Sequence, residues 1–269
     1  MSKYKEAKNC FVDEINPDEY IEIESSKEAY DQLAHSLSKA LKMVLLFGRP
    51  GTGKSMLLSR IYKNLKHQKE LYYFETPSTT KKEFFSKLFR VLTGKDLPTG
   101  SVVDFETFVK YLQANKENRD IIILIDEAQM YPSDILEDIR VLSDSGVVKF
   151  VISLHKTDDE DLVAKEHFKS RIWETIELKN ASKDELKTYI HKKILNNGLF
   201  DIANVIKDKH IALISKCTKG NYRETNKLLY TVFELYEYYD TNNPSKIDHQ
   251  SFSKKIIEMA AIKLGYINV

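Results

Sequence analysis

The chain has 269 residues, of which 42% are apolar and 30% are charged, with a formal net charge of +1. This composition describes a globular protein with one sizeable core and room for a smaller second domain. The near-neutral charge provides no global attraction to nucleic acid, and two distant cysteines indicate neither a disulfide framework nor a zinc site.

The N-terminal stretch, residues 1–9, is polar and lacks the apolar centre of a signal peptide. The longest apolar runs, residues 43–47 and 121–125, have five residues each and are too short to span a bilayer. We therefore expect a cytoplasmic protein without direct membrane insertion.

The first part of the chain predicts an arm, a helix and a strand. Residues 11–24 mix apolar residues with Pro17 and acids, which indicates an extended arm. A helix is predicted from Ser25 to about Leu41, with Ser25 as its N-cap and Glu28 three residues later. The apolar run 43–47 predicts the first strand.

A glycine-rich stretch, residues 48–55, follows this strand and leads into a helical pattern that begins near Met56. A strand, such a loop and a helix in this order are the setting of a phosphate-binding loop. The glycines allow backbone N–H groups to surround a polyphosphate, and the helix start adds its positive end. Lys54 can reach the β- and γ-phosphates, and the Ser55 hydroxyl can bind Mg²⁺. The predicted nucleotide-binding residues are Gly48, Arg49, Pro50, Gly51, Thr52, Gly53, Lys54, Ser55 and Met56.

Strands and helices alternate after this loop, which predicts an α/β fold with a parallel sheet. The further strands are expected at residues 71–74, 121–125, 147–154 and 172–178. Aromatic helical stripes at 81–93 and 105–112 are more typical of core packing than of a base-stacking platform, and a further helix is predicted at 134–144. Beyond Ser182 the pattern is helical only, with a capping box from Ser182 to Glu185 and helices at about 208–217, 222–239 and 249–264.

Two acids follow the continuous apolar strand 121–125. Ligands of open α/β sheets bind at the carboxyl ends of the strands, where Asp126 is expected to hold Mg²⁺ through water. Glu127 can orient or deprotonate an attacking water. No Asn-Lys-x-Asp segment occurs, and Glu127 argues against a simple kinase or a GTPase. The two motifs together predict nucleoside triphosphate hydrolysis.

The sequence resembles the AAA+ ATPases, and among them the ExeA/GspA/MshM group of secretion and pilus-assembly ATPases, with the TniB transposition ATPases as relatives. The resemblance extends from about Phe11 to about Ile262. It rests on the phosphate loop, on the run Asp126-Glu127-Ala128-Gln129 and on the segment Ser26–Ala29. It continues through Ser170-Arg171-Ile172, Leu178, Tyr189-Ile190 and Lys219-Gly220-Asn221-Tyr222-Arg223-Glu224-Thr225-Asn226. It implies a nucleotide-binding α/β domain at 1–180, a helical lid domain at 181–269, and ATP with Mg²⁺ as cofactors.

The resemblance also implies roles for three further residues. Arg171 matches the arginine finger supplied to a neighbouring subunit, and Arg223 matches the second sensor arginine at the γ-phosphate. His155 stands at the first sensor position, where Asn, Gln or Thr is more usual, and Ser153 is the alternative. An ordinary surface salt bridge is the other interpretation for both arginines, and His155 equally fits a histidine without a role.

Partners are likewise implied rather than read from the residues. We expect an ATP-dependent homo-oligomer with a protein partner, such as a membrane-anchored component of a type II secretion, type IV pilus or DNA-uptake system. A DNA-associated ATPase of transposition or replication is the less favoured alternative, and a nucleotide-dependent switch with little turnover is the third. No peptidoglycan-binding part or DNA-reading module is recognisable, so we expect a motor or switch that reaches its target through a partner.

Overall fold

The computed structural model describes residues 3–96, 105–114, 120–155 and 168–267. The chain forms two compact units. One, the sheet unit, comprises Glu28–Pro50 and Lys54–Leu178, and the other, the helical unit, comprises Met1–Lys27, Gly51–Gly53 and Lys179–Val269. Among the helices in the described part of the chain, none combines the length and the hydropathy that crossing a membrane requires.

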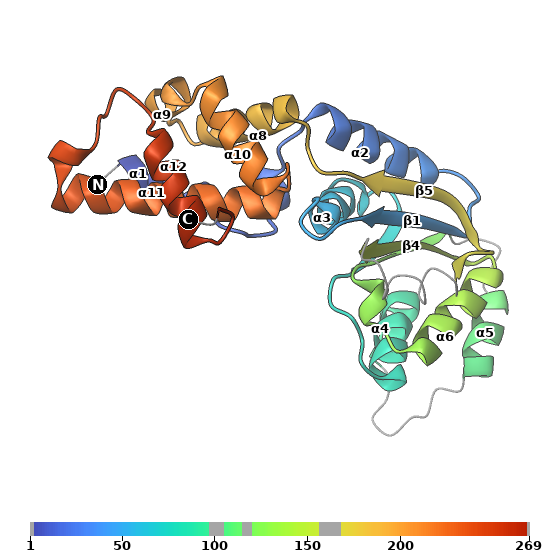
Figure 1. The fold of residues 1–269 in the computed structure, drawn as a ribbon. Coiled ribbons are helices and arrows are strands. Elements are labelled where there is room, and N and C mark those ends of the chain that lie inside the picture. Colours follow the sequence, from blue (N-terminus) through green and yellow to red (C-terminus); the bar gives the residue numbers. More distant parts are fainter. Residues whose placement is uncertain (1–2, 97–104, 115–119, 156–167, 268–269) are drawn as a thin grey trace. The chain divides into compact units, whose positions relative to one another are not determined.

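The sheet unit is built on a five-stranded sheet with the order β2-β3-β4-β1-β5 (Figure 1). The strands are β1 (Met43–Gly48), β2 (Glu70–Phe74), β3 (Ile121–Ile125), β4 (Val148–His155) and β5 (Ile172–Leu178). Every neighbouring pair is parallel. The predicted α/β fold with a parallel sheet flanked by helices is therefore confirmed.

Helices cover both faces of this sheet (Figure 1). On one face α2 (Glu24–Ser36) and α3 (Lys54–Leu65) pack on Leu46, Leu124 and Val151. On the other face α4 (Lys81–Thr93), α5 (Phe105–Ala114) and α6 (Ser133–Asp144) pack on Leu45, Ile123 and Ile152. Successive residues of a strand point to opposite faces, so a strand buried on both faces must be continuously apolar. This is why β3 consists of five fully buried aliphatic residues.

The helical unit has a core of its own. It contains α8 (Lys183–Asn196), α9 (Phe200–Val205), α10 (Asp208–Thr218), α11 (Tyr222–Asn242) and α12 (Lys254–Lys263), together with α1 (Lys3–Asn9). The capping box predicted at Ser182 and Glu185 is confirmed, with both of its reciprocal hydrogen bonds present. The helices α1 and α9 are short and were not predicted.

The N-terminal 27 residues group with the helical unit, whereas the sequence placed them in the first domain. Tyr4 stacks on Tyr236 with ring centroids 4.8 Å apart, and Phe11 stacks on Phe233 at 5.8 Å. Aromatic pairs of this kind bury a large apolar area, which ties the arm to the helical core. The expected extended arm includes one short 3-10 turn, Pro17–Glu19.

The start of α2 also differs from the prediction. The helix begins at Glu24 and ends at Ser36, so Ser25 is inside the helix instead of capping it. The Ser26 side chain accepts a hydrogen bond from the Ile23 N–H at 3.0 Å, and this side chain serves the helix start instead. The last helix begins at Lys254 rather than at residue 249, and two short 3-10 helices that were not predicted, η3 and η4, span Ala128–Met130 and Pro244–Lys246.

Candidate functional site: a phosphate loop beside an acidic pair

The predicted phosphate loop joins β1 to α3, as its sequence setting requires. β1 ends at Gly48 and α3 begins at Lys54. Gly53 has a φ of 93°, a conformation that side chains with a Cβ rarely adopt, so a glycine is needed at this point. The loop therefore delivers Lys54 and Ser55 directly into the first turn of a helix, where the backbone N–H groups attract anions.

Lys54 is held inside the loop. Its ammonium donates hydrogen bonds to the carbonyl oxygens of Gly48 at 2.8 Å and Arg49 at 3.1 Å, and the residue is only 4% exposed. Arg49 and Pro50 are exposed, Thr52 is buried, and Ser55 and Met56 are partly exposed. A buried ammonium needs such acceptors, and phosphate oxygens are acceptors of the same kind.

Asp126 is buried at the end of β3, with both carboxylate oxygens in hydrogen bonds. The Tyr73 hydroxyl donates to Oδ2 at 3.1 Å, and the Glu127 N–H donates to Oδ1 at 2.9 Å. Burial, followed by the charge and hydrogen bond of Asp126, raises the pKa of Tyr73, so this phenol remains a donor. Tyr73 thus fixes the orientation of a carboxylate that is 3% exposed.

Glu127 forms a triangle with Gln129 and His155. His155 Nε2 lies 2.9 Å from Glu127 Oε1, the Gln129 amide donates to Oε2, and the same amide lies 3.2 Å from His155 Nδ1. A carboxylate only accepts, so the His155 nitrogen that faces it carries the proton. The His155 hydrogen bond, supported by Gln129 and Lys54, holds the pKa of Glu127 below its usual value despite partial burial. Glu127 is therefore an ionised carboxylate held by two donors.

The topology of the sheet brings these groups together at the carboxyl ends of its strands. Gly48 of β1 is paired with His155 of β4, and Ile125 of β3 is paired with Ile152 of β4. Because the strands are parallel, the phosphate loop, the acidic pair and His155 all follow carboxyl ends, where open α/β sheets bind their ligands. The phosphate loop precedes the acidic pair by about 70 residues, and His155 follows Glu127 by 28 residues. The strand order makes these three segments neighbours.

Ser153, the alternative to His155, lies two residues earlier on β4. Its side chain is fully buried, and its hydroxyl has no hydrogen-bond partner among the described residues. His155 is the residue of the two that contacts Glu127.

Arg171 lies at the amino ends of the strands, the end of the sheet opposite the phosphate loop. It precedes β5, whose first residue is paired with Met43 and whose last is paired with Gly48. The length of this strand, at about 3.3 Å per residue, separates Arg171 from the loop of its own chain by about 20 Å. Its guanidinium binds Asp144 at 2.9 Å, and Lys42 binds the other oxygen of the same carboxylate at 3.0 Å. These partners, Arg171 above all, lower the pKa of Asp144.

Arg223 belongs to the helical unit. It is in the first turn of α11, half exposed, and its Nε donates to Asp13 at 3.1 Å. The N-cap of this helix is Asn221, whose side chain accepts from the Glu224 N–H at 3.2 Å. The segment Gly220–Asn226 is thus an ordinary capped helix start that presents Arg223 on the surface.

Three partners of the site residues were not predicted. Tyr73 holds Asp126, Gln129 holds Glu127, and Asp144 holds Arg171. The sequence contained a signal for Tyr73: a tyrosine near the end of one strand can hydrogen-bond to a carboxylate at the carboxyl end of the neighbouring strand. Asp144 had none, because its pairing depends on how α6 packs relative to β5.

The residues of this edge fit a magnesium-bound triphosphate. The Ser55 hydroxyl and the Asp126 carboxylate are the hard oxygen ligands that Mg²⁺ prefers. Lys54 and the N-terminal turn of α3 supply positive charge and N–H donors for phosphate oxygens. The donor set therefore matches the chemistry of ATP with Mg²⁺.

Comparison with known proteins agrees with this geometry. Residues 38–157 match a family model described as an AAA domain. General secretion pathway protein A of Aeromonas hydrophila is 29% identical over 132 residues, which is 48% of this chain and 24% of that protein. The matched part thus spans about a quarter of the length of this relative.

Solved structures share the fold at low sequence identity. The ORC1 protein of Aeropyrum pernix in complex with DNA has a TM-score of 0.61 at 14% identity, over 96% of this chain and 69% of that chain. Cdc6p of Pyrobaculum aerophilum has a TM-score of 0.61 at 16% identity, over 87% and 66%. The RuvB Holliday junction branch migration motor of Thermotoga maritima has a TM-score of 0.53 at 18% identity, over 94% and 73%. Residues 38–157 are therefore similar to an AAA domain, the fold is shared with these solved structures, and about half of the chain is similar to a secretion-pathway protein.

Proposed function

We propose that this protein binds ATP with Mg²⁺ and hydrolyses ATP at the carboxyl edge of its sheet. The observation that carries the proposal is the convergence of Lys54, Asp126 and Glu127, from segments far apart in the sequence, on that one edge. When bound, Mg²⁺ would supply positive charge that neutralises part of the charge on the phosphates. Ser55 and Asp126 would hold this ion, and the loop from Gly48 to Met56 would hold the nucleotide.

The Glu127 carboxylate is the proposed general base. It is ionised, and the positive charge of Lys54 helps to keep it so. It can therefore accept a proton from a water that attacks the γ-phosphate. His155 and Gln129 orient it through their hydrogen bonds. In this assignment His155 takes the first sensor position, and Ser153 is a buried hydroxyl of the strand.

Arg171 and Arg223 are proposed to complete the site when the protein has bound ATP and formed a homo-oligomer. Arg171 lies about 20 Å of strand away from its own phosphate loop, so it can act only on the loop of another copy. This supports an ATP-dependent homo-oligomer. Arg223, exposed at the start of α11, is proposed as the second sensor that contacts the γ-phosphate.

The biological role that we propose is that of an accessory motor or switch for a type II secretion, type IV pilus or DNA-uptake system in the cytoplasm. Its support is the similarity to General secretion pathway protein A, which extends over 48% of the chain. A membrane-anchored component of such a system is the proposed protein partner.

A DNA-associated ATPase of transposition or replication is the second candidate. The fold is shared with the ORC1 protein in complex with DNA and with the RuvB branch migration motor. The third candidate is a nucleotide-dependent switch with little turnover, which requires the same loop but no rapid hydrolysis.

ATP turnover with and without duplex DNA separates these candidates. An accessory motor should hydrolyse ATP at a rate that duplex DNA leaves unchanged, and Lys54→Ala should abolish both ATP binding and turnover. Stimulation by DNA that disappears as salt rises would instead favour the DNA-associated ATPase. Tight ATP binding with almost no turnover would favour the switch. Unaltered ATP affinity of Lys54→Ala in calorimetry would refute the phosphate-loop assignment.

A further inference from the structure

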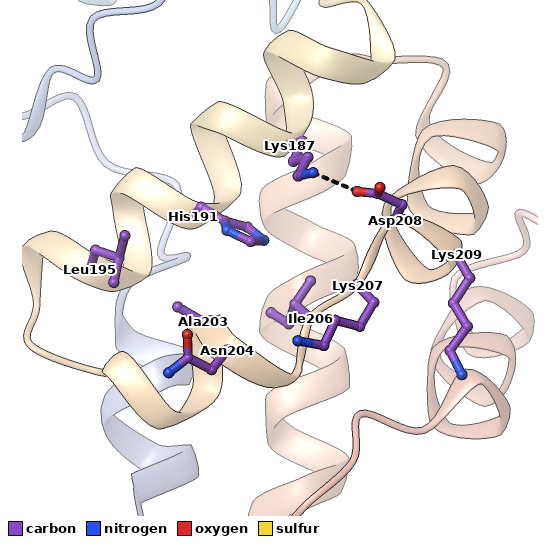
Figure 2. Close-up of a pocket in the computed structure, with 9 residues that line it drawn as sticks. All are labelled: Lys187, His191, Leu195, Ala203, Asn204, Ile206, Lys207, Asp208 and Lys209. Carbon is purple, nitrogen blue, oxygen red and sulfur yellow. Dashed lines mark ion pairs between the residues drawn. The ribbon is translucent and has the colours of Figure 1, made fainter.

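The helical unit contains a surface groove that the proposed nucleotide site does not use. It lies between α8, α9 and the start of α10 (Figure 2). Its volume is about 550 Å³. Ala203 and Ile206 are buried beneath it, and Leu195 is 39% exposed at its edge. We call this feature the lysine groove, after its residues Lys187, Lys207 and Lys209.

The charges around the lysine groove are mainly positive. Lys187 is paired with Asp208 at 2.6 Å. Lys207 and Lys209 flank the same aspartate, and neither ammonium takes part in an ion pair within the described residues. Lys207 is also the N-cap of α10 without a side-chain cap, so the positive end of an 11-residue helix opens at this place. The groove therefore attracts negatively charged groups.

His191 adds a hydrogen-bond acceptor to these cations. One of its ring nitrogens bonds to the Ile206 backbone, while Nε2 is buried and has no partner among the described residues. Burial, the largest influence, lowers the pKa of His191, so the imidazole is neutral near pH 7 and Nε2 presents a lone pair. Figure 2 shows this ring reaching from α8 into the groove.

We propose that the lysine groove binds an acidic segment of a partner protein. Carboxylates of the segment would pair with Lys207 and Lys209. An apolar side chain would cover Leu195 and Ile206. A peptide supplies carboxylates and an apolar side chain together, whereas a nucleic acid backbone supplies negative charge without an apolar side chain for Leu195.

A designed peptide of alternating Glu and Leu residues with a fluorescent label is the probe for this proposal, read by fluorescence anisotropy. We expect binding to the full-length protein that weakens with salt. Lys207→Glu combined with Lys209→Glu should lower the affinity about tenfold or more, through lost attraction and new repulsion. The matched control is Lys254→Glu combined with Lys255→Glu, which makes the same charge change at two exposed lysines of α12 and should leave the affinity unchanged.

Two further measurements keep the outcome decisive if a variant folds poorly. A peptide with Gln in place of Glu should fail to bind the unaltered protein. In the ¹⁵N-histidine NMR spectrum of the unaltered protein, the Glu–Leu peptide should shift the Nε2 resonance of His191. Equal affinity of both lysine variants, or an unmoved His191 resonance at saturating peptide, would overturn the proposal. Displacement of the bound peptide by a short DNA duplex would replace it with a nucleic acid site.

Discussion

At the scale of single residues, the proposed site depends on Glu127. Its φ of 49° is a left-handed conformation that few residues other than glycine adopt. Such strain is typical of functional sites, and here it turns the carboxylate toward His155 and Gln129.

Replacing Glu127 by Gln should preserve ATP binding and stop turnover. The amide fills the same space but cannot accept a proton from water. ATP affinity from calorimetry should be unchanged while phosphate release falls by about a hundredfold or more. Hydrolysis at the parental rate would remove Glu127 from the mechanism.

Tyr73→Phe tests the support of Asp126. Removing the hydroxyl leaves one oxygen of a buried carboxylate without its donor, so a correctly oriented metal ligand is lost. The Mg²⁺ concentration that gives half-maximal turnover should rise about tenfold. Tyr72→Phe, on the same strand, removes a hydroxyl bonded to Glu70 instead and is the matched control. Identical behaviour of the two variants would contradict the role of Tyr73.

At the scale of elements, the helical unit depends on a close contact between two connections. The Ala181 N–H donates to the Gly220 carbonyl at 2.9 Å, which joins the segment before α8 to the turn before α11. A Cβ at Gly220 would lie 2.0 Å from the Ala181 oxygen, in a backbone that cannot move without breaking this bond.

Gly220→Ala should therefore destabilise the protein by about 3 kcal/mol or more, which urea denaturation followed by circular dichroism would measure. Gly198→Ala is its control. Gly198 has a similar φ of 75° but no atom within 4 Å of the added Cβ, so only the conformational strain of about 1 kcal/mol remains. Equal losses in the two variants would show that the contact with Ala181 is unimportant.

At the scale of the whole molecule, the edge strand β5 combines two exposed features. Arg171 precedes it, and Trp173, the only tryptophan of the chain, is 64% exposed. An exposed tryptophan beside a candidate arginine finger is suited to a contact between copies, where tryptophan is enriched.

Assembly should therefore be visible in the fluorescence of Trp173. On addition of ATP to Glu127→Gln protein, its emission should shift to shorter wavelength and its quenching by acrylamide should decrease. Trp173→Ala should assemble more weakly, as measured by sedimentation. An emission spectrum unaffected by assembly would place the contact between copies elsewhere.

Mixing two inactive variants tests whether the site is shared. Arg171→Ala should bind ATP but lose about a thousandfold in turnover, and Lys54→Ala should not bind ATP. In mixed assemblies some interfaces pair the intact loop of the first with the intact arginine of the second, so part of the activity should return. Sedimentation must first show that Lys54→Ala assembles. Substantial activity of Arg171→Ala alone would rule out the finger.

The sequence by itself determined the features that are encoded locally. The glycine-rich loop between β1 and α3, the aliphatic run of β3 and the capping box at Ser182 depend on residues within one strand, turn or helix start, so spacing and residue type suffice. Short helices such as α1 and α9 were missed because a few residues carry too little periodicity.

Only the tertiary structure decided which distant segments meet. The strand order β2-β3-β4-β1-β5 makes His155 a neighbour of Gly48. It also makes β5 the outermost strand beside β1, and Arg171 precedes this strand at the end of the sheet opposite the phosphate loop. The contacts of Tyr73 with Asp126 and of Arg171 with Asp144 follow from that order and from helix packing. The N-terminal segment belongs to the helical unit because Tyr4 and Phe11 stack on aromatic rings of α11. No local pattern in the sequence indicates these contacts. Such contacts between residues far apart in the sequence depend on the packing of the whole core, which no short stretch of sequence specifies.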